Sequence, residues 1–171
     1  MTELVLSDGA KTVVRKLTEK GYKAYAVGGC VRDLLRGRTP DDYDIATSAF
    51  PENVAEVFSA YDVIPTGLKH GTVTVVIDKI PYEITTFRKD GNYPDGRRPE
   101  KVEFVDDLKE DLSRRDFTVN AMAYNDDEGL IDPFGGEQDL KNKILRCVGD
   151  PEKRFTEDAL RILRAARFCS T

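Results

Sequence analysis

The chain has 171 residues, of which 40% are hydrophobic and 33% are charged, and its formal net charge is -5 at pH 7. This length suits one ordinary domain, and this composition excludes a disordered or fibrous chain. The acidic balance argues against a surface that grips an RNA backbone over many phosphates, because such affinity comes largely from clustered Lys and Arg.

The sequence favours a cytoplasmic protein with no membrane partner. No apolar run approaches the roughly 20 residues needed to span a bilayer. The first residues, MTELVLSDGAK, lack a basic leader followed by a hydrophobic stretch. Three widely spaced cysteines, Cys30, Cys147 and Cys169, contain no CxxC pair, which favours reduced, structural thiols over zinc or redox chemistry.

The first part of the chain alternates helices and strands. Apolar residues at helical spacing between Ser7 and Gly21 predict a helix with Ser7 as its N-cap. Strands are expected at 22–27 and 42–46, and helices at 31–35 and 51–59. Alternating apolar residues over 72–77 and 80–87, with Asp78-Lys79 between them, predict a β-hairpin.

The second part begins with a segment of different composition. Residues 88–101 hold two Pro and two Gly and show no apolar periodicity, which predicts a long, functional loop. The later elements expected are a strand at 102–105, a helical stretch through 112 and 117 to 122, a turn-rich segment around 132–136 and a helix from 156. The order predicts an α/β domain with a mixed sheet over 1–150, and a helical region that begins near 151.

Acidic residues on two of the expected strands could bind a cation. Asp42 and Asp44 alternate along one strand, so both side chains should point to the same face. Two such carboxylates can hold Mg²⁺, and two-metal phosphoryl transfer needs oxygen ligands of this kind. Glu83 lies within an apolar alternation, where a carboxylate is costly to bury, and is the expected third ligand. A lone D-x-D is more typical of a solvated turn than of a metal site, so the neighbouring motifs decide between these two interpretations.

Two segments carry groups suited to a nucleotide. In GGCVRD (28–33) the glycines allow a phosphate to approach the backbone amides at a helix start, where Arg32 could reach a phosphate oxygen. In RRDFTVNA (114–121) the arginines suit triphosphate oxygens, and Asp116 could accept a hydrogen bond from a ribose hydroxyl. The plainer alternatives are an ordinary strand-to-helix turn and a charged helix start.

The last expected helix carries charges at near three-residue spacing, namely Glu157, Asp158, Arg161, Arg164 and Arg167. Such a pattern usually marks a solvated, salt-bridged face. The alternative is an edge that faces a nucleotide, where Asp158 and Arg161 could pair with a base edge in place of a template.

Five segments, in this order, resemble the motifs of bacterial class II CCA-adding tRNA nucleotidyltransferases and their poly(A) polymerase relatives: GGCVRD, DDYDIA, TTFRKDGNYPDGRRPEKVEF, RRDFTVNAMAYN and EDALRILRAARF. The fixed order makes a chance match very improbable. The resemblance covers nearly the whole chain. It implies a polymerase-beta-like nucleotidyltransferase head at 1–150 and the start of a helical neck at 151–171.

The resemblance implies Mg²⁺-dependent, template-independent addition of CMP and AMP, from CTP and ATP, to the 3′ end of tRNA. Asp42 and Asp44 match the metal carboxylates, and Asp158 and Arg161 match the residues that select CTP or ATP. Residues 88–101 match the loop associated with switching from C to A addition. With the groups named above, the expected nucleotide-binding residues are Gly28, Gly29, Arg32, Arg114, Arg115, Asp116, Asn120, Asp158, Arg161, Arg164 and Arg167.

Two alternatives stay open at this point. A poly(A) polymerase would use the same head chemistry and add only AMP to RNA 3′ ends. A nucleotide-binding fragment would be inactive without the helical body and tail domains that, in the family, hold the acceptor arm of tRNA. The main tRNA contacts are expected in those domains, since this chain stops at Thr171 within the neck helix.

Overall fold

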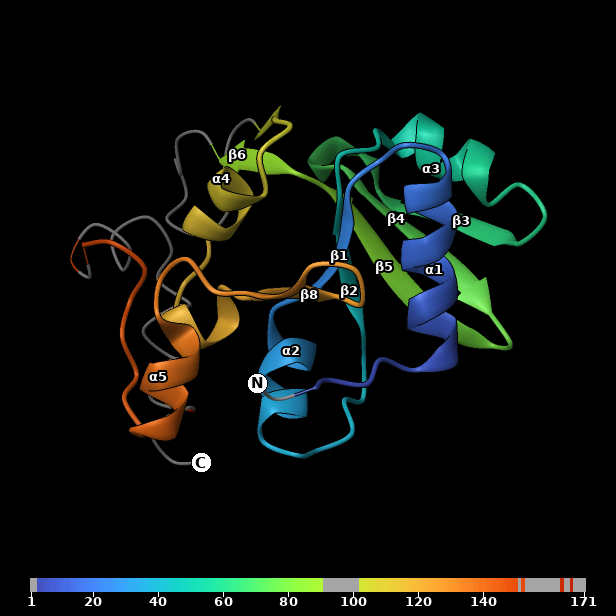
Figure 1. Cartoon of the computed structure of the whole chain (residues 1–171). Coiled ribbons are helices and arrows are strands. Elements are labelled where there is room, and N and C mark those ends of the chain that lie inside the picture. The colour runs from blue at the N-terminus through green and yellow to red at the C-terminus, as the bar shows by residue number, and fades with distance from the viewer. Residues whose placement is uncertain (1–2, 91–101, 151, 153–163, 165–166, 168–171) are drawn as a thin grey trace.

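A seven-stranded mixed sheet organises the described part of the chain, which comprises residues 3–90, 102–150, 152, 164 and 167 (Figure 1). The elements are α1 (Asp8–Glu19), β1 (Ala24–Val27), α2 (Gly29–Leu35), β2 (Asp44–Thr47), α3 (Pro51–Val57), β3 (Asp62–Gly67), the 3-10 helix η1 (Leu68–His70), β4 (Thr72–Ile77), β5 (Ile80–Thr86), β6 (Arg88–Asp90), β7 (Val102–Phe104), α4 (Leu108–Ser113), the 3-10 helix η2 (Thr118–Asn120), β8 (Ala123–Asn125), β9 (Gly129–Ile131) and α5 (Gly136–Lys141).

The strand order of the large sheet is β3-β4-β5-β2-β1-β8-β9. β2 and β5 run parallel, with Asp44 opposite Glu83, whereas the other neighbouring strands described in this sheet are antiparallel. β6 and β7 form a separate two-stranded ribbon. The fold is therefore an α/β arrangement with a mixed sheet, as the element order predicts.

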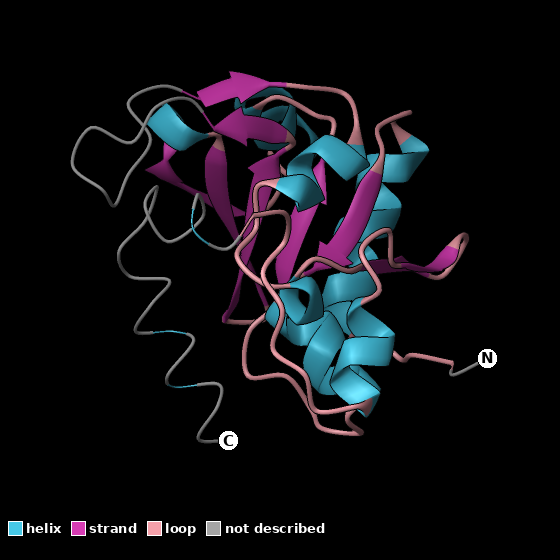
Figure 2. Ribbon diagram, turned by 90° about the vertical axis from the view of Figure 1, so that its left-hand side faces the viewer, coloured by secondary structure: helices cyan, strands magenta, loops and turns pink. Residues whose placement is uncertain are grey.

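Each face of the sheet packs against its own apolar cluster. On β2, Ile45 joins the larger cluster, which includes Val13 and Leu17 of α1, while its neighbour Ala46 joins a second cluster with Leu112 of α4. Successive strand residues point to opposite faces, so the sheet separates the two cores. Figure 1 shows α1 and α3 beside β4 and β5, with α4 and α5 on the other side. Figure 2, a quarter turn away, shows the strands gathered above a group of helices.

Two local predictions are confirmed in detail. The Ser7 hydroxyl caps α1 by accepting a hydrogen bond from the N–H of Ala10 at 3.2 Å. Asp78 and Lys79 connect β4 to β5 with φ values of 51° and 66°. Positive φ at both central residues is the geometry of the two-residue turn whose twist suits a hairpin. The alternation on either side therefore identified both strands and their connection.

The helix predicted through 112 and 117 to 122 is wrong. α4 ends at Ser113, and Phe117 is extended with φ -123° and ψ 151°. The backbone here pairs with a distant segment instead of continuing the helix: the N–H of Thr118 donates to the carbonyl of Arg146, and Phe117 bridges Cys147. A short 3-10 helix and β8 follow. Two short helices, α4 and η2, therefore stand where one helix was predicted, and residues 114–117 separate them, with Phe117 extended.

Other boundaries differ from the predictions. Residues 88–90 of the expected loop form β6, because they pair with β7 in an antiparallel ribbon, while 91–101 lie outside the described residues. β3, β8 and β9 were not predicted. The expected strand at 42–46 begins only at Asp44. Of the helix expected from 156, only Arg164 and Arg167 are described, and both have helical backbone.

Within the described residues, no helix combines the length and apolar character needed to cross a bilayer.

The first residue of α5, Gly136, packs closely against the backbone of η2. A methyl group added at Gly136 would overlap the backbone carbonyl of Thr118 and approach Cγ of Met122 at 3.1 Å. Because a backbone carbonyl cannot rotate away, Gly136→Ala is expected to lower the free energy of unfolding by about 1–3 kcal/mol. Thermal denaturation checks this, with the exposed Gln138→Ala in the same helix as control. Equal melting temperatures for both variants would contradict the close packing.

Candidate active site

Parallel pairing of β2 and β5 brings two acidic side chains side by side. Asp44 opens β2 and lies directly opposite Glu83 in the middle of β5, so both project from the same face of the sheet. Asp42 precedes the strand instead of alternating along it as predicted, but its charge still acts on both partners. The structure thus places Asp44 and Glu83 side by side, with Asp42 close enough for its charge to act on both.

The carboxylates perturb one another. The surrounding protein desolvates Asp44 and raises its pKa; the charge of Asp42 raises it further, while Arg115 and a hydrogen bond with Glu83 lower it. Desolvation is also the main cause of the raised pKa of Glu83, followed by the charges of Asp44 and Asp42. Ionising the whole cluster is therefore unfavourable without a cation.

The donor set fits a hard divalent cation. Oxygen ligands suit Mg²⁺, and a bound dication would offset the repulsion among these carboxylates. In the described part of the chain, no group of three or more His, Cys, Asp or Glu side chains is placed so that it could hold a metal ion. Mg²⁺ commonly binds through one or two carboxylates together with water and substrate phosphates, so an incomplete protein cage suits this ion.

The glycine turn lies beside the carboxylates. Val27, the last residue of β1, pairs with Asp44, and Gly28 follows with φ 75°, a conformation that favours glycine. The position of a Cβ on Gly28 is only 3.3 Å from Nη1 of Arg115. Side chains at this position would meet the guanidinium. The absence of one lets Arg115 and the turn share a single small region beside Asp44.

Arg115 is a cation held within the protein. Its side chain is 18% exposed, and its Nη2 donates to Asp111 at 3.2 Å. Desolvation lowers the pKa of its guanidinium, an effect that the charge of Asp111 opposes. Its Nε is buried and has no hydrogen-bond acceptor among the described residues. A desolvated cation with a spare donor is suited to an anionic ligand such as a phosphate.

A second chain of hydrogen bonds joins α2 to η2. Arg32 donates through Nη1 to Oδ1 of Asn120 at 2.8 Å, and Nδ2 of Asn120 lies 3.4 Å from Oδ1 of Asp116. Oδ1 of Asp116 also accepts the N–H of Phe117, and Oδ2 lies 2.9 Å from Nη1 of Arg164. Both oxygens of Asp116 therefore have protein partners, so its role toward a ribose hydroxyl stays a prediction.

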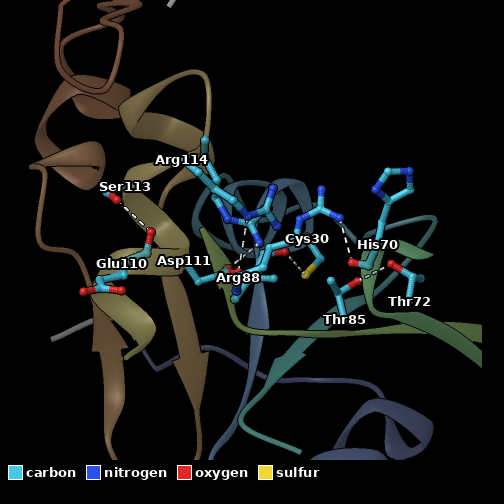
Figure 3. Close-up of polar contacts among 11 residues, drawn as sticks. Cys30, His70, Thr72, Thr85, Arg88, Glu110, Asp111, Ser113 and Arg114 are labelled. Atoms are coloured by element: carbon cyan, nitrogen blue, oxygen red, sulfur yellow. Dashed lines mark hydrogen bonds and ion pairs between the residues drawn. The ribbon is translucent and has the colours of Figure 1, made fainter. Parts of the chain in front are cut away.

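Asp111 joins two of the predicted arginines and was not singled out by the sequence. It is 0% exposed, and its carboxylate accepts from Arg115, from Nε of Arg114 at 3.4 Å and from the N–H of Arg88 at 3.0 Å. Figure 3 shows Asp111 between Arg88 and Arg114. The spacing of three and four residues before the arginines was the available signal, but it is equally typical of a surface ion pair.

The remaining predicted site residues lie at the edge of these hydrogen-bond networks, on the exposed surface or outside the described residues. Gly29 begins α2, and the position of a Cβ on it is 3.4 Å from Nη2 of Arg32. Arg164 reaches Asp116, and Arg167 is exposed. Asp158 and Arg161 lie outside the described residues. The structure therefore brings the carboxylates, the glycine turn and the arginines of 114–115 together and leaves base selection as a prediction.

The crowded carboxylates predict a variant that is more stable than the parent. Since the folded-state pKa of Asp44 is raised, its ionised form opposes folding at pH values above that pKa, and this cost disappears as the group protonates in both states at low pH. Asp44→Asn should therefore raise the melting temperature at pH 8, and the gain should shrink as the pH falls toward 4. The exposed Asp127→Asn is the control. An equal or lower melting temperature at pH 8 would refute the destabilisation of ionised Asp44 by burial and by the charge of Asp42.

Comparison with known families and structures gives consistent matches. A family model described as the poly A polymerase head domain matches residues 24–146. The chain is 54% identical over 158 residues to a CCA-adding enzyme of Geobacillus thermodenitrificans, covering 92% of this chain and 39% of the relative. It is 54% identical over 162 residues to a CCA-adding enzyme of Listeria monocytogenes, covering 94% of this chain and 40% of the relative.

Solved structures match in the same way. The crystal structure of the Bacillus stearothermophilus CCA-adding enzyme in complex with CTP has a TM-score of 0.84 and 51% identity, covering 93% of this chain and 38% of that one. A tRNA nucleotidyltransferase complexed with a primer tRNA and an incoming ATP analog has a TM-score of 0.72 and 39% identity, covering 91% and 44%. The chain spans about 40% of the length of the curated relatives it matches.

Proposed function

The chain belongs to the family of the poly A polymerase head domain, and on this premise we propose that it is the catalytic head of a CCA-adding tRNA nucleotidyltransferase. It would transfer CMP and AMP from CTP and ATP, without a template, to the 3′ end of tRNA. The observation that carries the proposal is the register of Asp44 with Glu83 beside Arg115 and the glycine turn. This arrangement offers ligands for a cation and for a triphosphate at one place.

Mg²⁺ is the proposed cofactor, held by Asp42 and Asp44 with Glu83 next to them. When bound, it supplies a lower pKa for the attacking 3′ hydroxyl and charge stabilisation at the phosphoryl group. The pairing of β2 with β5 holds the carboxylates of Asp44 and Glu83 side by side. No histidine is needed as general base, and the backbone carbonyl of His70 accepts a hydrogen bond from Arg88 as part of the surrounding scaffold.

The triphosphate is proposed to lie between Gly28 and Arg115. The glycine permits close approach of an anion to the backbone, and the Arg115 guanidinium offers a buried, charged donor. Arg32 and Arg114 flank this position, while Asp116 and Asn120 hold Arg32 and Arg164 in place. Base selection by Asp158 and Arg161, with Arg164 and Arg167 as further contacts, is proposed from the resemblance.

The division into domains and the cellular location are also proposals. Residues 1–150 would form the head and 151–171 the start of a helical neck, which agrees with a family match over 24–146. The principal tRNA contacts would belong to regions that the matched relatives have beyond the part aligned here. Because CTP, ATP and tRNA are cytoplasmic substrates, the cytoplasm is the proposed compartment.

Incorporation of labelled CTP and ATP, separately and together, into a tRNA without its CCA end tests the proposal. Two C followed by one A, with Mg²⁺ and not with a chelator, is the expected product. A-only tailing of varied RNA would instead support the poly(A) polymerase alternative. Binding of nucleotide without incorporation would support the head as a binding unit that requires further domains. If the chain shows no binding and no incorporation, the proposal that it is an enzyme is refuted.

A further inference from the structure

We propose that Asp111 is a positioning residue for the triphosphate: its buried carboxylate fixes the guanidinium of Arg115 beside Gly28. The inference rests on the proposed function, because it concerns the same nucleotide. It adds a residue that touches neither the substrate nor the carboxylate cluster.

The guanidinium of Arg115 spans a short distance between α4 and the glycine turn. At one end, Nη2 donates to Oδ2 of Asp111 at 3.2 Å. At the other end, Nη1 lies where a Cβ on Gly28 would be 3.3 Å away. A planar group fixed at one end keeps its other end in a defined direction. The Asp111 contact therefore determines where Arg115 presents its charge.

Asp111 is itself held by rigid parts of the structure. It belongs to α4, one turn before Arg115, and its Oδ1 accepts the backbone N–H of Arg88 in β6 at 3.0 Å. The Arg88 side chain in turn donates through Nη1 to the carbonyl of His70 at 2.8 Å (Figure 3). A carboxylate that bonds to a strand backbone as well as to two arginines has little freedom to rotate. It can therefore orient the arginine side chain.

The charge state of Asp111 supports this role. Burial alone would raise the pKa of Asp111, but the charges of Arg114 and Arg115 and the Arg88 N–H outweigh it and lower the pKa below its usual value. The group is thus ionised at neutral pH. Since the carboxylate is 0% exposed and already accepts from three donors, it does not reach a nucleotide. It acts through Arg115.

A second interpretation of the same contacts gives the opposite result. If the carboxylate merely competed with phosphate for Arg115, its removal would free the guanidinium and strengthen triphosphate binding. If it positions the guanidinium, its removal weakens triphosphate binding and leaves the nucleoside contacts unchanged. The ratio of the affinities for ATP and AMP separates these cases. A general loss of stability would weaken the binding of both ligands and leave this ratio unchanged.

The experiment measures dissociation constants of ATP and AMP for the 171-residue chain by calorimetry in Mg²⁺. Asp111→Asn is expected to weaken ATP binding about tenfold, a typical loss for one charge-assisted hydrogen bond, with AMP binding unchanged. Asp111→Glu keeps the charge but shifts it by one methylene group. Its ratio of ATP to AMP affinity is therefore expected to lie between those of the parent and of Asp111→Asn. Adding Asp111→Asn to Arg115→Ala should leave the ratio at the value of Arg115→Ala alone.

Asn125→Ala is the matched control, because Asn125 is also buried and hydrogen-bonded but lies at the far end of β8. It should lower the melting temperature without changing the ratio. Tighter ATP binding by Asp111→Asn overturns this inference but not the proposed function. An unchanged ratio of ATP to AMP affinity in Asp111→Glu, and in Asp111→Asn if that variant folds, has the same consequence. A wild-type chain that binds neither nucleotide overturns the proposed function, and this inference with it.

Discussion

Asp44→Asn is expected to reduce nucleotide incorporation at least ~10³-fold while the protein stays folded. The substitution keeps the shape of the side chain and removes one of the two charges that lie opposite each other on β2 and β5. A metal ion that organises phosphoryl transfer contributes several kcal/mol, and about 4 kcal/mol corresponds to ~10³ in rate. Because the same variant removes a desolvated charge and its repulsion from Asp42, lost activity should accompany raised thermal stability.

Initial rates with labelled CTP, across a series of Mg²⁺ concentrations, measure this effect. Loss of a metal ligand predicts that high Mg²⁺ restores part of the rate, whereas a misfolded protein would not respond. Asp127→Asn serves again as the charge-matched control and should retain the parent rate. An Asp44→Asn variant with a parent-like rate would remove the carboxylate cluster from the mechanism.

The second large effect is expected at Arg115, where the shape of the cation matters as well as its charge. Arg115→Lys keeps the charge but loses the planar fork, one end of which binds Asp111 while the other reaches the glycine turn. Lys acts as a point charge and cannot hold both directions. We expect about 30-fold weaker ATP binding, equivalent to roughly 2 kcal/mol.

Titration of the variant with ATP by calorimetry gives the dissociation constant directly. Arg15→Lys, an exposed position on α1 whose side chain is 67% accessible, is the matched control and should bind ATP like the parent. If Arg115→Lys binds ATP as tightly as the control does, charge alone is sufficient at this position. Such a result would contradict the role of the planar guanidinium between Asp111 and Gly28.

Local signals predicted much of the fold, because some elements are decided by neighbouring residues. The cap at Ser7 and the turn at Asp78-Lys79 depend on contacts within a few positions, and both are confirmed. β8 is three residues long, too short for an alternation to be recognised. The backbone at Phe117 is extended because it pairs with Cys147, a partner thirty positions later, and helical propensity gave no indication of it.

The candidate site also contains residues that a local sequence pattern identifies and residues that only tertiary packing identifies. Glu83 was predicted because a carboxylate within an apolar alternation needs a reason, and β5 places it opposite Asp44. Asp111 precedes the two arginines with the spacing of an ordinary exposed ion pair, and only the packed structure shows that it is fully buried. The spacing reports which side chains can meet, whereas tertiary packing decides whether water surrounds them.

The parallel pairing of β2 with β5 has a consequence for the order in which the protein folds. Asp44 and Glu83 are separated along the chain by α3, β3, η1 and β4, so their pairing closes a long loop. Contacts of high sequence separation form slowly, since closing the intervening loop costs conformational entropy. We therefore expect that, during refolding, nucleotide incorporation returns later than the circular dichroism signal of the helices. Recovered incorporation would then indicate that β2 and β5 have paired in the correct register.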